Sequence, residues 1–245
     1  MMRSGNPVLN DKTFTRHVDL TGEDRMTLMG TVHKTAALLL LLVITASITW
    51  GMVFAGSMSA GPLAIAGAGF GFIVAIVTYF KPRWVPVTAP IYAALKGLFL
   101  GGVSAILEAR FPGIVLQAVG LTFGTLFALL GAYRSGLIKA TENFKLGVAA
   151  ATGGIVLVYL LSMVLRLFGT EIPLIHEAGW VGIGFSAFVV VIAALNLVLD
   201  FDFIENGAES GAPKYMEWFG AFGLMVTLIW LYIEILVLLS KLRSR

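Results

Sequence analysis

Long apolar runs dominate this sequence, and each is long enough to cross a lipid bilayer as a helix. A transmembrane helix needs about 20 apolar residues, because it rises about 1.5 Å per residue and the hydrocarbon core is about 30 Å thick. Seven segments meet this length: His33–Phe54, Ala60–Phe80, Pro86–Leu107, Ile114–Tyr133, Leu146–Phe168, Trp180–Phe203 and Tyr215–Leu239. The sequence therefore predicts an all-α integral membrane protein with seven transmembrane helices.

The composition supports this prediction and excludes several classes of function. Only 13% of the residues are charged, about half the share that a soluble domain carries on its wet surface. There is no cysteine, which rules out disulfides and thiolate chemistry. The sequence has no catalytic triad, zinc-protease motif or nucleotide-binding loop, so we expect neither an enzyme nor a cofactor. Its cations cluster in short loops, which favours lipid headgroups over nucleic acid as partners.

The charge distribution predicts the domain organisation and the orientation. Residues 1–30 are polar and form a predicted tail, and residues 31–245 form the transmembrane domain. Basic residues concentrate in this tail and in the links after the second and fourth spans, so the positive-inside rule predicts a cytoplasmic N-terminus. Seven full spans then place the basic C-terminal end, residues 241–245, on the other side. The alternative is that one segment re-enters without crossing.

Of the charged residues within or at the ends of the apolar spans, five matter most: Lys96, Asp200, Asp202, Glu217 and Glu234. A charge inside a bilayer is costly, so each is a candidate functional residue. Glu234 has no charged neighbour between residues 218 and 240, so its carboxyl group must be protonated, paired, close to a wet cavity or within reach of the headgroups. Asp200 lies deeper in the sixth span than Asp202, and we interpret Asp202 as an interfacial acid. Lys96 lies in mid-span, where we expect it either to pair with one of the acids or to extend toward the headgroups.

Three short motifs carry a resemblance to a known family. Residues Trp230–Leu236, Leu199–Ile204 and Tyr92–Gly101 resemble the seventh-, sixth- and third-helix motifs of the Bax inhibitor/YccA-like family, also called the transmembrane Bax inhibitor motif family. The sequence is identified as a bacterial member. The resemblance implies a seven-helix bundle whose last helix is central, and a location in the inner membrane.

The same resemblance implies a pH-sensitive leak of Ca²⁺ through the membrane. In this family one acid from helix six and one from helix seven share a proton and act as the gate. Carried over to this sequence, the pH-sensing pair is Asp200 and Glu234, which would also contact the permeant Ca²⁺. Two close carboxyl groups cannot both ionise at low cost, so such a pair titrates as a unit.

Two alternatives remain open at this stage. A tight hairpin of the last two helices would set Asp200 opposite Glu217, which lies about 25 Å along the helix from Glu234. Glu217 is therefore a rival partner, with Asp202 and Lys96 as auxiliary residues of an ion pathway. The second alternative concerns function: a non-conducting membrane protein that modulates a membrane protease or a stress response.

Overall fold

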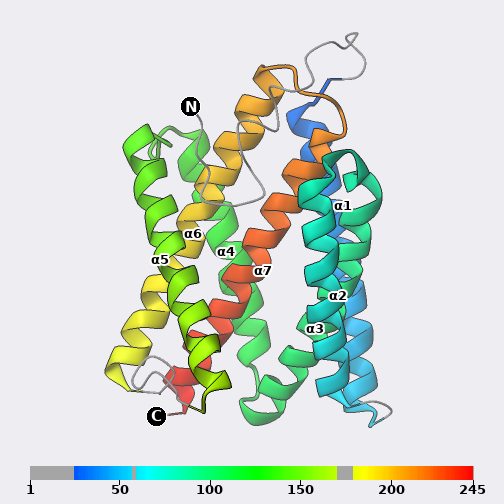
Figure 1. Ribbon diagram of the computed structural model, residues 1–245, viewed down its shortest axis with the longest axis vertical. Coiled ribbons are helices and arrows are strands. Elements are labelled where there is room, and N and C mark those ends of the chain that lie inside the picture. Colours follow the sequence, from blue (N-terminus) through cyan, green and yellow to red (C-terminus); the bar gives the residue numbers. More distant parts are fainter. Residues whose placement is uncertain (1–24, 57–58, 170–178, 245) are drawn as a thin grey trace. The chain divides into compact units, whose positions relative to one another are not determined.

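The computed structural model describes residues 25–56, 59–169 and 179–244, which are almost entirely helical (Figure 1). The predicted all-α fold with seven long helices is confirmed for this part of the chain. The helices are α1 (Leu28–Phe54), α2 (Ala60–Phe80), the short 3₁₀ helix η3 (Pro82–Trp84), α3 (Val85–Arg110), α4 (Ile114–Arg134), α5 (Glu142–Leu167), α6 (Trp180–Glu209) and α7 (Met216–Arg243). Residues 1–24 of the predicted tail lie outside the described residues.

Several helices are longer than the apolar segments that revealed them. Helix α5 begins at Glu142, after Thr141, whose side chain accepts a hydrogen bond from the backbone N–H of Phe144. Helix α6 continues to Glu209. Hydropathy detects only the apolar part of a helix, whereas capping and polar turns extend it into water. The estimate that set Asp200 opposite Glu217 assumed a sixth helix ending near residue 203, whereas α6 ends at Glu209.

The chain divides into two compact units. Among the described residues, unit 1 contains 113–169, 179–202 and 227–244, and unit 2 contains 25–56, 59–112 and 203–226. Unit 1 therefore holds α4, α5, most of α6 and the second half of α7. Helix α7 contributes to both units and is the most enclosed helix, with 67% of its apolar window buried, against 17–44% in the other six spans.

Small residues bring the first three helices of unit 2 close together. Helix α3 packs against both α1 and α2. A Cβ atom at Gly97 or Gly101 would collide with α1, and one at Gly67 would meet the backbone of α3 at Leu95 and Phe99. Glycine at these positions lets helix backbones approach closely, as is common between membrane helices. The glycine-rich composition thus serves helix packing here.

Unit 1 is held together by an apolar cluster of α5 and α6 residues, against which α7 also packs. Ile155, Val189 and Ile192 are buried in its centre, and Tyr159 and Trp230 lie against them. Tyr159 belongs to α5 and Trp230 to α7. Two residues that contact the buried carboxyl group of Glu234 therefore pack against this cluster.

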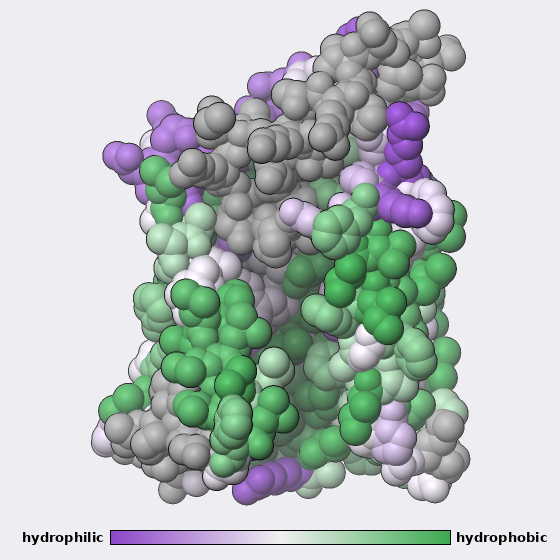
Figure 2. Space-filling view, in the orientation of Figure 1, coloured by the Kyte–Doolittle hydropathy of each residue, from purple (hydrophilic) through white to green (hydrophobic). Residues whose placement is uncertain are grey.

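The outward faces of the helices are apolar. Large hydrophobic side chains are exposed along α1, α2 and α5, among them Leu40, Ile48, Phe70, Ile73 and Leu157. Figure 2 shows hydrophobic residues over much of the surface of the helices. Apolar surface of this extent is covered by lipid in a membrane protein. Together with the seven long apolar helices, it identifies a multi-pass membrane protein.

Candidate functional site

The carboxyl group of Glu234 is buried within unit 1, where its side chain meets α5. The residue is 5% exposed. Its Oε1 accepts hydrogen bonds from the Tyr159 hydroxyl at 2.9 Å and from the indole Nε1 of Trp230 at 3.1 Å. Trp230 lies one turn earlier on α7, where an i, i+4 pair shares one helix face. Both hydrogen-bond donors are neutral. The ammonium group of Lys241, two turns later on α7, also acts electrostatically on this carboxyl group.

Glu234 is part of a longer series of polar contacts that we call the polar row. Four contacts between α5, α6 and α7 make it up: Lys145–Asp202 at 2.7 Å, Asn196–Thr152 at 2.9 Å, Tyr159–Glu234 at 2.9 Å and Lys241–Ser186 at 2.9 Å. Every one of these contacts joins two different helices of unit 1. The row therefore places polar groups at successive levels along otherwise apolar spans.

The sequence spacing explains why these residues share a row. Lys145, Thr152 and Tyr159 recur every seven residues on α5. Glu234 and Lys241 have the same spacing on α7. Seven residues make nearly two helical turns, so such residues return to the same face. This signal was present in the sequence, and the analysis of charged residues alone missed Tyr159, Thr152 and Asn196 because they are neutral.

Asp200 is fully buried in α6, at 0% exposure. The contact between Lys241 and Ser186 sets the antiparallel register of α6 and α7 in this unit. Glu234 lies seven residues before Lys241, and Ala193 lies seven residues after Ser186, so these two are about level. Asp200 then lies about 10 Å further along α6. A proton shared directly between the two acids, as the resemblance implies, would need the helices to shift by about two turns.

Asn196 lies between these two levels and has an orphaned acceptor. Its Nδ2 donates to the Thr152 hydroxyl oxygen at 2.9 Å and to the Ile192 carbonyl at 2.8 Å. The side chain is 2% exposed, yet among the described residues its Oδ1 has no hydrogen-bond partner. Leaving a buried acceptor unpaired costs about 1–3 kcal/mol. Such a group in a native protein requires an explanation.

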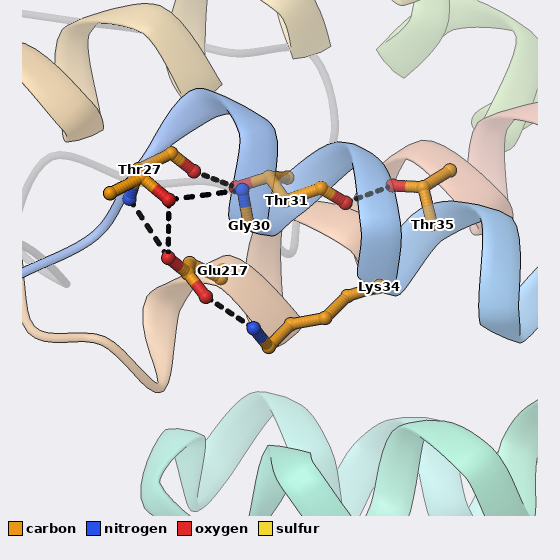
Figure 3. A network of polar contacts seen from close by, with 6 residues as sticks. All are labelled: Thr27, Gly30, Thr31, Lys34, Thr35 and Glu217. Atoms are coloured by element: carbon orange, nitrogen blue, oxygen red, sulfur yellow. Dashed lines mark hydrogen bonds and ion pairs between the residues drawn. The ribbon is translucent and has the colours of Figure 1, made fainter.

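Glu217 has a different environment, in unit 2 (Figure 3). Its carboxylate forms an ion pair with Lys34 and accepts hydrogen bonds from the backbone N–H and hydroxyl of Thr27, at 2.9 and 2.8 Å. Thr27 is also the N-cap of α1, where its hydroxyl oxygen accepts from the N–H of Gly30. The Lys34 ammonium lies 5.6 Å from the centre of the Trp218 ring. Glu217 thus ties the start of α7 to the start of α1.

The two auxiliary candidates also have defined surroundings. Asp202 pairs with Lys145 as part of the polar row. The Lys96 ammonium lies over the rings of Tyr92 and Phe99, 5.5 and 5.3 Å from their centres. Among the described residues no acid forms an ion pair with Lys96. Aromatic rings take the place of the expected acidic partner, because their electron-rich faces attract a cation.

Comparison with known proteins places the chain in a family. No curated protein and no solved structure matches it significantly. The sequence profile of a family described as Bax inhibitor 1 like matches residues 6–244, which is nearly the full length of the chain. The seven-helix membrane fold and the motifs on α3, α6 and α7 agree with that match. The chain belongs to the Bax inhibitor 1 like family.

Proposed function

We propose that this protein is a pH-sensitive cation leak whose pathway follows the polar row of unit 1. One observation carries the proposal: buried polar and charged groups link α5, α6 and α7 at successive levels of spans that are otherwise apolar. Polar groups at membrane depth are costly and mark ion pathways. Carboxyl, amide and hydroxyl oxygens are ligands for a hard cation such as Ca²⁺. The positive-inside rule supports a cytoplasmic N-terminus for this leak.

Glu234 and Asp200 supply the pH sensitivity in this proposal. The two hydrogen-bond donors to Glu234, Tyr159 and Trp230, are neutral. The Lys241 ammonium, two turns later on α7, interacts with Glu234 electrostatically. Gain or loss of a proton therefore changes the net charge of this part of the row. A change of buried charge biases the equilibrium between closed and open arrangements of the helices.

The test is Ca²⁺ flux into liposomes that contain only the purified protein. We expect wild type to conduct Ca²⁺ with a pH-dependent rate, and the double variant Asp200→Asn, Glu234→Gln to lose that pH response. The matched control is Glu209→Gln, which removes one acid at the exposed end of α6. The control should keep both flux and pH response.

Two outcomes would contradict the proposal. If the double variant keeps the wild-type pH response, Asp200 and Glu234 are not the sensor. If wild-type protein that is folded in the liposomes passes no cation at any pH, the leak itself is rejected. That second result favours the non-conducting alternative, a regulator of a membrane protease or of a stress response.

A further inference from the structure

We propose that Asn196 Oδ1, together with the Asp200 carboxyl group, forms a weak binding site for Ca²⁺ between the levels of Glu234 and Asp200. This proposal rests on the proposed cation leak and assigns a ligand to its pathway. Asn196 and Asp200 are four residues apart on α6. Side chains at this spacing lie on one helix face, with Cβ atoms about 6 Å apart. Two oxygen groups thus face the same side of α6 in a buried part of unit 1.

The orientation of the Asn196 amide is fixed by its donors. Nδ2 donates both of its hydrogens, one to Thr152 Oγ1 and one to the Ile192 carbonyl oxygen. A flipped amide would turn Oδ1 toward that carbonyl and bring two acceptors together. Oδ1 must therefore point away from both partners. Among the described residues it meets no donor, which is the arrangement expected of an oxygen that binds a cation.

The composition of the site indicates weak binding. Ca²⁺ takes six to eight oxygen ligands, and tight sites supply several carboxylates. The described residues contain no cluster of three or more acids, histidines or cysteines that could hold a metal ion. A site with one carboxyl group, one amide oxygen and water binds a cation loosely. Loose binding suits conduction, because a permeant ion must leave as readily as it enters.

The test is Ca²⁺ binding to purified protein in detergent, where binding is measured separately from flux. Asn196→Leu keeps the approximate volume and removes the amide oxygen, so we expect Ca²⁺ affinity to fall about tenfold. Asn196→Asp adds a charged ligand and should raise Ca²⁺ affinity about tenfold. Thr122→Val is the matched control, because it removes a buried hydroxyl group of unit 1 that bonds the Ala118 carbonyl oxygen of its own helix and lies outside the polar row. Its affinity should stay close to that of wild type.

The outcomes separate this proposal from the proposed function. Unchanged Ca²⁺ affinity in either folded Asn196 variant overturns the site, while the leak is still judged by liposome flux. Equal losses in Asn196→Leu and Thr122→Val also overturn it, because loss of any buried polar group of unit 1 would then lower the affinity. If Asn196→Leu does not fold, the gain of affinity in Asn196→Asp decides the question. Wild-type protein that conducts Ca²⁺ but shows no binding at concentrations that saturate flux also contradicts the site.

Discussion

Helix α7 carries two buried glutamates whose surroundings differ in one decisive respect. Glu217, in unit 2, is 1% exposed and is paired with the Lys34 ammonium. Glu234, in unit 1, is 5% exposed and is held by the hydroxyl of Tyr159 and the indole of Trp230. A carboxylate with a countercharge and two further donors is stable in its charged form. Glu234 has neutral hydrogen-bond donors and no ion pair within 4 Å among the described residues, and the Lys241 ammonium acts on it from two turns away on α7. Such a carboxyl group can exist in either form, which is what a sensor needs.

The comparison assigns a structural role to Glu217 and agrees with the sensor role that we propose for Glu234. Glu217 joins the beginning of α1 to the beginning of α7, and the backbone N–H of Met26 donates to the Ala212 carbonyl oxygen beside it, at 2.7 Å. Burial of an acid is therefore a poor guide to function unless its partners are known.

The largest expected effect comes from breaking the charge pair. Lys34→Met leaves the Glu217 carboxylate buried without a countercharge. We therefore expect the free energy of unfolding to fall by about 3 kcal/mol. The measurement is thermal or denaturant unfolding of the purified protein in detergent. The double variant Lys34→Met, Glu217→Gln should recover much of this loss, because no charge is left unpaired. A Lys34→Met protein as stable as wild type would contradict the structural role of Glu217.

A second, smaller effect should follow from crowding the same carboxylate without altering any charge. A Cβ atom at Gly30 would overlap the carboxylate of Glu217, so Gly30→Ala should destabilise the protein by about 2 kcal/mol. Gly51→Ala is a matched control on the same helix, since no atom lies within 4 Å of its Cβ position. The control should be neutral or slightly stabilising, because alanine favours helix more than glycine does. Equal melting temperatures for Gly30→Ala and Gly51→Ala would argue against the close approach of Gly30 to the Glu217 carboxylate.

The smallest stability effect is expected at Glu234. Tyr159→Phe removes one of its two neutral donors, and hydrogen bonds between membrane helices contribute about 1 kcal/mol each. In liposomes, the same variant should also shift the pH dependence of Ca²⁺ flux. Tyr79→Phe, at a more exposed position of α2, serves as the control. An unaltered pH profile in Tyr159→Phe would show that its hydroxyl does not position the sensor.

Much of the fold was predictable because membrane helices have a simple signature. The apolar segment Ala60–Phe80 coincides with α2, and the other six segments each lie on one helix. The family was also predictable, since the motifs around Tyr92, Asp200 and Glu234 agree with a match over residues 6–244. The partners of the acids were not predictable in the same way. Tyr159 lies 75 residues from Glu234 in the chain, and only the packing of α5 on α7 brings them together.

The sequence by itself determined that this chain is a multi-pass helical membrane protein with a few charges at membrane depth. That follows from composition and segment length, because a bilayer accepts apolar side chains and requires internally satisfied backbones. Only the tertiary structure decided which acid pairs with Lys34 and which accepts a hydrogen bond from Tyr159. It also decided that Asn196 lies between the levels of Glu234 and Asp200. These contacts depend on helix register and rotation, and a shift of one or two residues changes every partner without altering the hydropathy of any segment.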